Sequence, residues 1–257
     1  MHRRNFLTVS TAATLAGAAP AAPLKNAWFS LLYFYLRQGT QVSRTTAYLK
    51  NVWMPAATHA ELGPLGFFSP VFDERSPYIL SMLSFPSLAS MEAAHNRLAD
   101  DKEFLKGWEE YQSIQDPPYV RVESELLYAF DSAPQLVVPP TDAKRPARIF
   151  ELRTYESLTE LSLQRKIKMF NDGEAGIFRR VGMNPVFFGQ SVFGRNQPKL
   201  SYMLAYDDMA ARDKLWRDFS ADPEWQKLRA QPGFSDAELV SNISNPILRP
   251  LPFSSIR

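Results

Sequence analysis

Two short stretches place an arginine close to tyrosine or glutamate in runs whose alternation predicts β-strands. Arg37 lies in the first stretch, and Arg153 and Tyr155 lie in the second. A guanidinium group can hold two oxygens of a carboxylate or phosphate at once, so these residues are candidates for binding a ligand inside a barrel. The alternatives are a structural ion pair, for Arg153 with Glu151 or Glu156, and a position at the rim of the barrel.

Further candidates follow in the second half of the chain. Glu174 stands at a break in a predicted helix, where its carboxylate could act as a general base at a pocket mouth. The break could instead be a surface turn capped by Asp172. Asn242 lies in the closing predicted strand, where an amide could orient a ligand or mark an edge or a bulge. The central strands carry side chains that could stack on a planar ligand or fill the core, namely Phe187, Phe188, Gln190, Tyr202 and Tyr206.

Metal and cofactor chemistry has few possible ligands in this sequence. It contains no cysteine, which excludes disulfides, thiol nucleophiles and Cys-ligated zinc, and it contains three histidines. A haem would have to use His59 or His95, which show no metal-ligand spacing, so we predict no cofactor and no metal. Glycine-rich phosphate loops and the G-x-S-x-G elbow are absent from the sequence, which disfavours nucleotide-binding loops and triad hydrolases.

The first 24 residues have the order of an export signal. Arg3-Arg4 precedes Phe6-Leu7, a weakly apolar run and small residues such as Ala16-Gly17-Ala18. This order predicts a twin-arginine signal and a periplasmic or secreted protein; an amphipathic start to the fold is the alternative. The run is too short and too polar to predict a transmembrane span. Removal of both arginines lowers Lys+Arg from 29 to 27, equal to Asp+Glu, so the body gives no charge pattern for nucleic acid.

The elements that must position these side chains occur twice. A proline-rich linker over 132–147 separates a unit over 27–131 from a unit over 148–250, and 251–257 forms a tail. Three blocks recur in the same order at an offset of about 120 residues: Phe34–Arg37 as Phe150–Arg153, Gly66–Phe68 as Val186–Phe188, and Pro77–Phe104 as Pro198–Trp225.

Each half predicts the order strand, helix, strand, strand, helix, strand, and the first helix is disturbed near Pro55 in the first half and near 171–173 in the second. In the second half Asp207 or Asp208 can cap the second helix, Asp222-Pro223 starts a further turn, and 238–248 forms the closing strand. The shared order of strands and helices is typical of a ferredoxin-like unit, with both helices on one face of a four-stranded antiparallel sheet. We therefore predict an α+β protein in which two tandem ferredoxin-like units pack sheet to sheet as an intrachain dimeric α/β-barrel, without need of a second chain. Alternation along the strands predicts that one set faces the helices, namely Phe34, Leu36, Phe150 and Leu152. The other set faces the barrel interior or its mouth, namely Tyr33, Tyr35, Arg37, Glu151, Arg153 and Tyr155.

The second half resembles the NIPSNAP family. The resemblance lies in Arg148–Glu156, Tyr202–Arg212 with Asp222–Trp225, and Ser241–Pro250. It covers about 148–250, and the first half shares it only through the internal repeat. The resemblance implies the dimeric α/β-barrel superfamily but little chemistry. That superfamily includes haem-degrading and quinone-forming monooxygenases, chlorite dismutases and plain ligand binders, and fold alone does not decide function.

Three functions fit the sequence. The favoured one is an exported protein that binds a small apolar or aromatic ligand in the barrel. The second is a cofactor-independent monooxygenase or isomerase, in which Arg153, Tyr155 and Asn242 would polarise an oxygen in a dry pocket. The third is a non-catalytic scaffold with a filled barrel. The volume of the pocket separates the scaffold from the other two.

Overall fold

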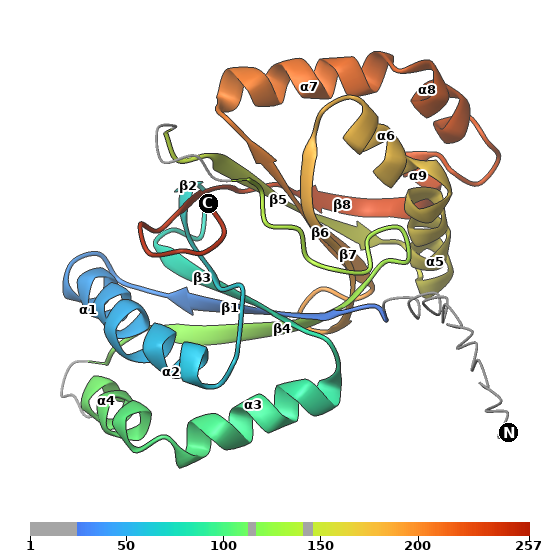
Figure 1. Ribbon diagram of the computed structural model, residues 1–257. Helices are drawn as coiled ribbons and strands as arrows, with labels where there is room; N and C mark the ends of the chain where they lie inside the picture. The colour runs from blue at the N-terminus through green and yellow to red at the C-terminus, as the bar shows by residue number, and fades with distance from the viewer. Residues whose placement is uncertain (1–24, 113–116, 141–145) are drawn as a thin grey trace, which may run out of the picture.

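The computed structural model describes residues 25–112, 117–140 and 146–257 (Figure 1). The predicted export signal, 1–24, lies outside these residues. No helix in the described ranges combines the length and the hydropathy that a bilayer crossing requires.

The first half contains four strands and two groups of helices. A π-helical segment, η1, lies directly between α1 and α2, at the place where the sequence predicts a disturbed helix near Pro55. The elements are β1 (Trp28–Tyr35), α1 (Thr40–Tyr48), η1 (Leu49–Trp53), α2 (Met54–His59), β2 (Gly66–Phe72), β3 (Tyr78–Phe85), α3 (Leu88–Asp100), α4 (Lys102–Gln112) and β4 (Arg121–Ala129).

The second half follows the same order and ends in two short strands. The interruption predicted at 171–173 is again a π-helical segment, η2. The elements are β5 (Ile149–Ser157), α5 (Glu160–Met169), η2 (Phe170–Glu174), α6 (Ala175–Arg180), β6 (Asn184–Phe193), β7 (Lys199–Tyr206), α7 (Met209–Ala221), α8 (Pro223–Arg229), α9 (Asp236–Leu239), β8 (Val240–Ser244) and β9 (Ile247–Pro250).

Side-chain caps start the helices that follow the third strand of each half. Ser87 accepts a hydrogen bond from the N–H of Ser90 at the start of α3, and Asp208 accepts one from the N–H of Ala211 at the start of α7. Asp222 then caps α8, whose first residue is a proline. Each cap satisfies an N–H that the helix itself leaves free.

The strands close into one antiparallel barrel. Their order is β7-β6-β4-β1-β3-β2-β9-β5, and pairing of β5 with β7 completes the ring. Strand β8 also pairs with β5, farther along β5 than β9 does. Helices α1–α4 cover one side of the barrel and α5–α8 cover the opposite side (Figure 1). The protein is therefore a mixed α+β fold with its helices outside the barrel.

Apolar side chains fill the middle of the barrel. Strands of both halves contribute buried residues, and Ile256 from the C-terminal segment is fully buried in the same cluster. The predicted tail is thus packed into the core. Members of this barrel core include Phe29, Leu31, Leu80, Phe150, Leu152, Phe187, Met203 and Leu248.

The predicted facing of β1 is correct, and that of β5 is reversed. Phe34 and Leu36 pack toward the helices, as predicted. In the second half, however, Phe150 and Leu152 point into the barrel core, while Tyr155 packs in the helix layer. The candidate residues of β5 consequently lie outside the barrel.

The strand register explains this reversal. Tyr33 pairs with Leu80 and Thr154 pairs with Ser201, so matching positions in the two ladders are 121 residues apart. The sequence block that matched the two opening strands has an offset of 116. Because side chains alternate along a strand, an odd shift in alignment exchanges its two faces.

Candidate functional site

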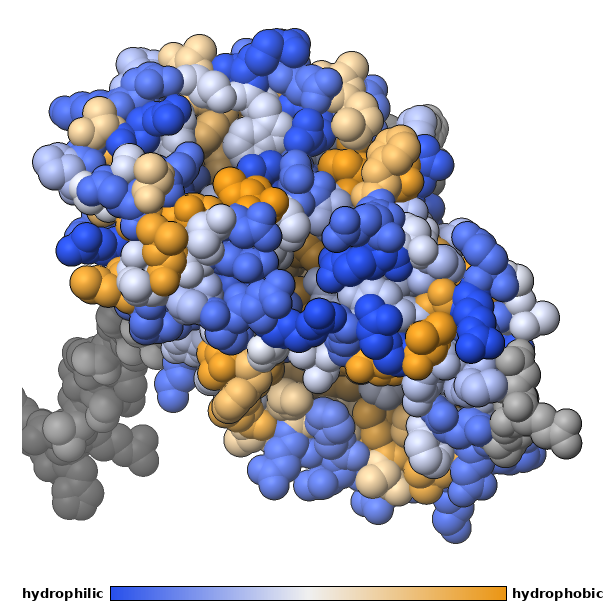
Figure 2. Space-filling view, turned by 180° about the vertical axis from the view of Figure 1, so that it is seen from behind, coloured by the Kyte–Doolittle hydropathy of each residue, from blue (hydrophilic) through white to orange (hydrophobic). Residues whose placement is uncertain are grey.

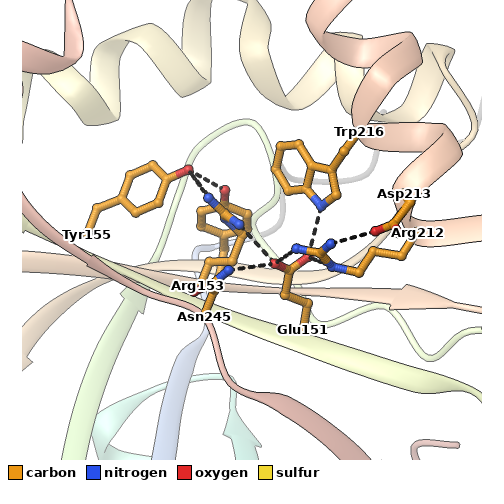
Figure 3. A network of polar contacts seen from close by, with 8 residues as sticks. Glu151, Arg153, Tyr155, Arg212, Asp213, Trp216 and Asn245 are labelled. Carbon is orange, nitrogen blue, oxygen red and sulfur yellow. Dashed lines mark hydrogen bonds and ion pairs between the residues drawn. The ribbon is translucent and has the colours of Figure 1, made fainter. Parts of the chain in front are cut away.

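A buried carboxylate organises the polar residues of the second half (Figure 3). Glu151 is 0% exposed. It accepts hydrogen bonds from Arg153 Nη1 at 2.8 Å and from Arg212 Nη2 and Nε at 2.6 and 3.0 Å. Trp216 Nε1 donates at 2.9 Å and Asn245 Nδ2 at 3.3 Å. Burial alone would raise the pKa of Glu151, but Arg212, Arg153 and Trp216 outweigh it and lower the pKa.

Arg153 is committed to partners within this Glu151 network. Its Nε and Nη2 donate to Tyr155 Oη at 3.4 and 3.2 Å, and Tyr155 Oη lies 2.8 Å from Tyr202 Oη. The guanidinium also lies over the Trp216 ring. Burial raises the pKa of Tyr202 well above its usual value. Arg153 therefore forms the structural ion pair with Glu151 that the sequence offered as an alternative to ligand binding.

Glu174 is buried and does not lie at a pocket mouth. It is 2% exposed, and its Oε2 accepts from Lys166 Nζ at 3.2 Å. The Lys166 ammonium also lies near the rings of Tyr155, Phe170 and Trp225. The prediction of an accessible general base at this break is therefore wrong, because the π-helical segment turns the carboxylate inward.

The remaining predicted site residues are dispersed. Arg37 is exposed beyond β1, and its backbone N–H donates to Gln41 Oε1. Phe188 packs against Tyr202 in the core of the second half. Gln190 is 3.4 Å from Glu160 on the outside of the sheet. Asn242 donates to Glu156 Oε1 at an end of the barrel. Arg153, Tyr155 and Tyr202 come together, whereas Arg37, Gln190 and Asn242 lie apart from them.

An apolar cavity lies in the first half, where no site residue except Arg37 was predicted. Its volume is about 500 Å³. Side chains of β1, β3 and β4 form its floor and residues of α1, η1, α3 and α4 form its walls, so it lies between the outer face of the sheet and the helices. We call it the N-terminal cavity; its lining includes Leu32, Phe34, Tyr48, Leu49, Trp53, Leu83, Ala94, His95, Leu98, Phe104, Trp108, Tyr111 and Tyr119.

Apolar side chains also gather on the surface near this half. Figure 2 shows them in the lower part of the molecule, where Figure 1 places the helices of the first half. Leu105 and Trp108 of α4 and Leu88 of α3 are exposed. The helix layer over the cavity is thus less completely packed than a closed core.

Some of the residues that line the N-terminal cavity carry polar groups. The Nε1 of Trp53 is buried and has no hydrogen-bond partner among the described residues. His95 Nδ1 is 2.8 Å from the carbonyl of Met91. A carbonyl only accepts, so Nδ1 carries the proton and Nε2 is the basic nitrogen of the neutral ring. Tyr48 and Tyr111 stack at 4.1 Å between ring centroids.

Small residues on the sheet open this cavity. Ser81 pairs with Leu32 in the first half, and Tyr202 pairs with Arg153 at the matching place in the second. Ser30 likewise stands where the second half has Glu151. Two serines in place of a tyrosine and a glutamate leave space beneath the helices, whereas the second half fills that space with its polar network.

Comparison with known proteins places the second half in a family. Residues 150–255 match the NIPSNAP family model. The second half is a NIPSNAP domain. The Glu151 network and the Lys166–Glu174 pair lie within it, while the N-terminal cavity lies in the half that precedes it. A search of curated proteins found no match.

Solved structures resemble the whole barrel. A proposed monooxygenase from Lactobacillus acidophilus NCFM has a TM-score of 0.59 and 10% identity, covering 87% of this chain and 93% of its own. An anthrone oxidase-like protein has a TM-score of 0.55 and 12% identity, covering 88% and 92%. Identities this low show the shared fold alone. Both halves, including the half outside the NIPSNAP domain, thus belong to one recurring architecture.

Metal ligands do not gather in the described part of the chain. No three histidine, cysteine, aspartate or glutamate side chains come close enough there to hold an ion. His59 and His95, the two haem candidates, are on α2 and α3 and do not share a cavity.

Proposed function

We propose that the protein binds a small planar aromatic molecule in the N-terminal cavity. The observation that carries this proposal is a cavity of about 500 Å³ with aromatic walls, one of whose residues, Trp53, has a buried indole N–H without a partner in the described part of the chain. This volume is within the range of small-molecule sites, which combine an apolar lining with a few polar groups. The ligand space proposed here lies between sheet and helices, not between the two faces of the barrel, because apolar side chains fill the barrel's middle.

The lining also indicates the ligand's chemistry. Rings such as Tyr48, Phe104 and Tyr119 offer flat apolar surface for stacking or edge contacts with another ring. The Trp53 N–H is a donor only, and a buried donor without a partner costs free energy. A carbonyl on the ligand would satisfy it. A fused-ring ketone therefore fits better than a saturated hydrocarbon.

Filling the cavity is expected to abolish binding. Ala94 is buried on α3 and lines the cavity, so Ala94→Phe places a phenyl ring in the space a ligand needs. With anthrone as the probe, quenching of tryptophan fluorescence should saturate in the wild type. In Ala94→Phe the midpoint should rise at least tenfold. Ala93→Phe, an exposed change one residue away, should leave it unaltered; equal binding by all three proteins would contradict the proposal.

A cofactor-independent monooxygenase is the second candidate function. Two observations favour it: His95 lines the cavity with Nε2 as its basic nitrogen, and proteins of this fold include a proposed monooxygenase and an anthrone oxidase-like protein. In this reaction His95 would accept a proton from the ligand's acidic methylene group. Dioxygen would then oxidise the carbanion, leaving one oxygen atom as a new ketone and releasing the other as water.

Removal of that base is expected to slow the reaction. General-base catalysis contributes roughly 10²–10⁴-fold, so His95→Gln should lower the rate of oxygen consumption with anthrone by about 10²-fold or more. His59→Gln changes an exposed histidine outside the N-terminal cavity and should have no effect. A rate in His95→Gln equal to the wild type would exclude histidine as the base while leaving ligand binding intact.

We further propose that the two halves are ferredoxin-like units derived from one duplicated ancestor, and that residues 1–24 direct export. The matching ladder positions 121 residues apart and the two π-helical segments support the duplication. The paired arginines support the route. Under this proposal the two units now differ at one matching place: the first half has an open cavity there, and the NIPSNAP domain has the Glu151 network.

A further inference from the structure

A second cavity lies at an end of the barrel and shares only Ser124 of its described lining with the N-terminal cavity. It has a volume of about 510 Å³ and is lined largely by polar and charged side chains from both halves. We call it the barrel-end cavity; its lining is Tyr33, Phe72, Asp73, Glu74, Arg75, Glu123, Ser124, Glu125, Thr154, Glu156, Arg195, Asn196, Lys199, Asn242, Ser244, Asn245 and Pro246.

Glu125 lines this cavity and has one buried, unsatisfied carboxylate oxygen. The residue is 7% exposed. Its Oε2 accepts from Lys199 Nζ at 3.0 Å, while its Oε1 is buried without a hydrogen-bond partner among the described residues. A buried charged oxygen without a donor is costly. This atom is therefore a position where a ligand's N–H or O–H donor would be stabilised.

The charge of the lining favours a cation. Five carboxylates and three basic groups line the cavity, which leaves a formal charge of −2. All three basic groups are already paired with carboxylates: Lys199 with Glu125, Arg195 with Glu123, and Arg75 with Asp73.

Glu156 is one of the two carboxylates left over. Its Oε1 accepts hydrogen bonds from Asn196 and Asn242, both at 3.1 Å. These amides are neutral, so they orient the carboxylate without cancelling its charge. A cation in the cavity thus has a free oxygen at Glu125 and an uncompensated negative charge at Glu156.

We propose that the barrel-end cavity binds a small organic amine through its primary ammonium group, with Glu125 Oε1 as the acceptor. An ammonium brings three N–H donors, whereas a divalent metal such as Ca²⁺ takes six to eight oxygen ligands. One free carboxylate oxygen suits the ammonium. Tyr33 and the exposed ring of Phe72 line the same cavity and offer an apolar surface and a π-face to the alkyl ammonium.

Calorimetric titration of the whole protein with 1,5-diaminopentane at neutral pH tests this site. We expect saturable binding that weakens as salt is added, and no binding of 1,5-pentanediol, which has the same chain without charge. Glu125→Gln should weaken diamine binding at least tenfold. The double variant Glu125→Gln with Lys199→Gln removes both charges of the buried pair and should also bind at least tenfold more weakly, which keeps the test valid if the single variant folds poorly.

A matched control and two contrary outcomes complete the test. Glu92→Gln alters an exposed carboxylate on α3 outside this cavity and should bind as the wild type does. Absence of diamine binding to the wild type would overturn the proposal. Equal binding by wild type and both Glu125 variants would also overturn it, since the amine would then lie elsewhere. Neither result bears on anthrone binding in the N-terminal cavity.

Discussion

Glu151→Gln is expected to destabilise the folded protein by about 3–5 kcal/mol, the usual cost of removing one member of a buried charge network. The carboxylate receives donors from Arg153, Arg212, Trp216 and Asn245 and is inaccessible to solvent. Glutamine has the same shape but cannot neutralise two guanidinium groups. Urea denaturation, followed by circular dichroism, should show a lower midpoint with an unchanged slope.

An exposed ion pair in the same half provides the control. Glu224 pairs with Arg180 on the surface of the NIPSNAP domain, and its side chain is 68% exposed. Surface pairs contribute about 0–1 kcal/mol, so Glu224→Gln should change stability little. If the two variants lost similar stability, the Glu151 network would not be the organising feature of this domain.

The same network makes stability depend on acidity. The pKa of Glu151 is lowered in the folded protein because Arg212, Arg153 and Trp216 outweigh its burial. The unfolded chain then binds a proton at higher pH than the folded one does, so stability falls with falling pH. The loss begins near the unfolded value of about 4.3 and continues down through the lowered folded value. Glu151→Gln should lose less stability over this window than the wild type.

Much of the fold could be predicted because its signals are local. Aspartate before an apolar run predicts a helix start, and Asp208 and Asp222 cap helices as expected. The disturbances near Pro55 and at 171–173 are the two π-helical segments. The predicted closing strand over 238–248 was less accurate, because α9 and two short strands occupy that region and the chain between them.

The position of the cavity could not be predicted in the same way. A void depends on which small residues face which helix, and this requires the strand register. Ser30 and Ser81 carry no motif; they become informative only when the ladders place them opposite the helices, where the second half has Glu151 and Tyr202. An alignment error of odd length puts such residues on the wrong face, as it did for β5.

The second large effect is expected at Lys166. Its ammonium is 1% exposed and lies 3.2 Å from Glu174, itself 2% exposed. Lys166→Met leaves a buried carboxylate without a counter-charge, which costs about 3–5 kcal/mol at neutral pH. Burial already raises the pKa of Glu174 in the wild type despite the lysine beside it. Without the lysine this pKa rises further, because the main opposing charge is gone while burial and the nearby Asp236 carboxylate still raise it.

The direction of the pH effect distinguishes this pair from the Glu151 network. In Lys166→Met the folded state binds a proton at Glu174 at higher pH than the unfolded chain does, so stability must increase as the pH falls from 7 toward 5. Urea midpoints across this range should show that recovery in Lys166→Met. They should not show it in the double variant Lys166→Met with Glu174→Gln, which has no carboxyl to protonate. A flat profile in the single variant would mean that the carboxylate reaches water once the lysine is gone, and that helix packing over η2 is looser than its burial indicates.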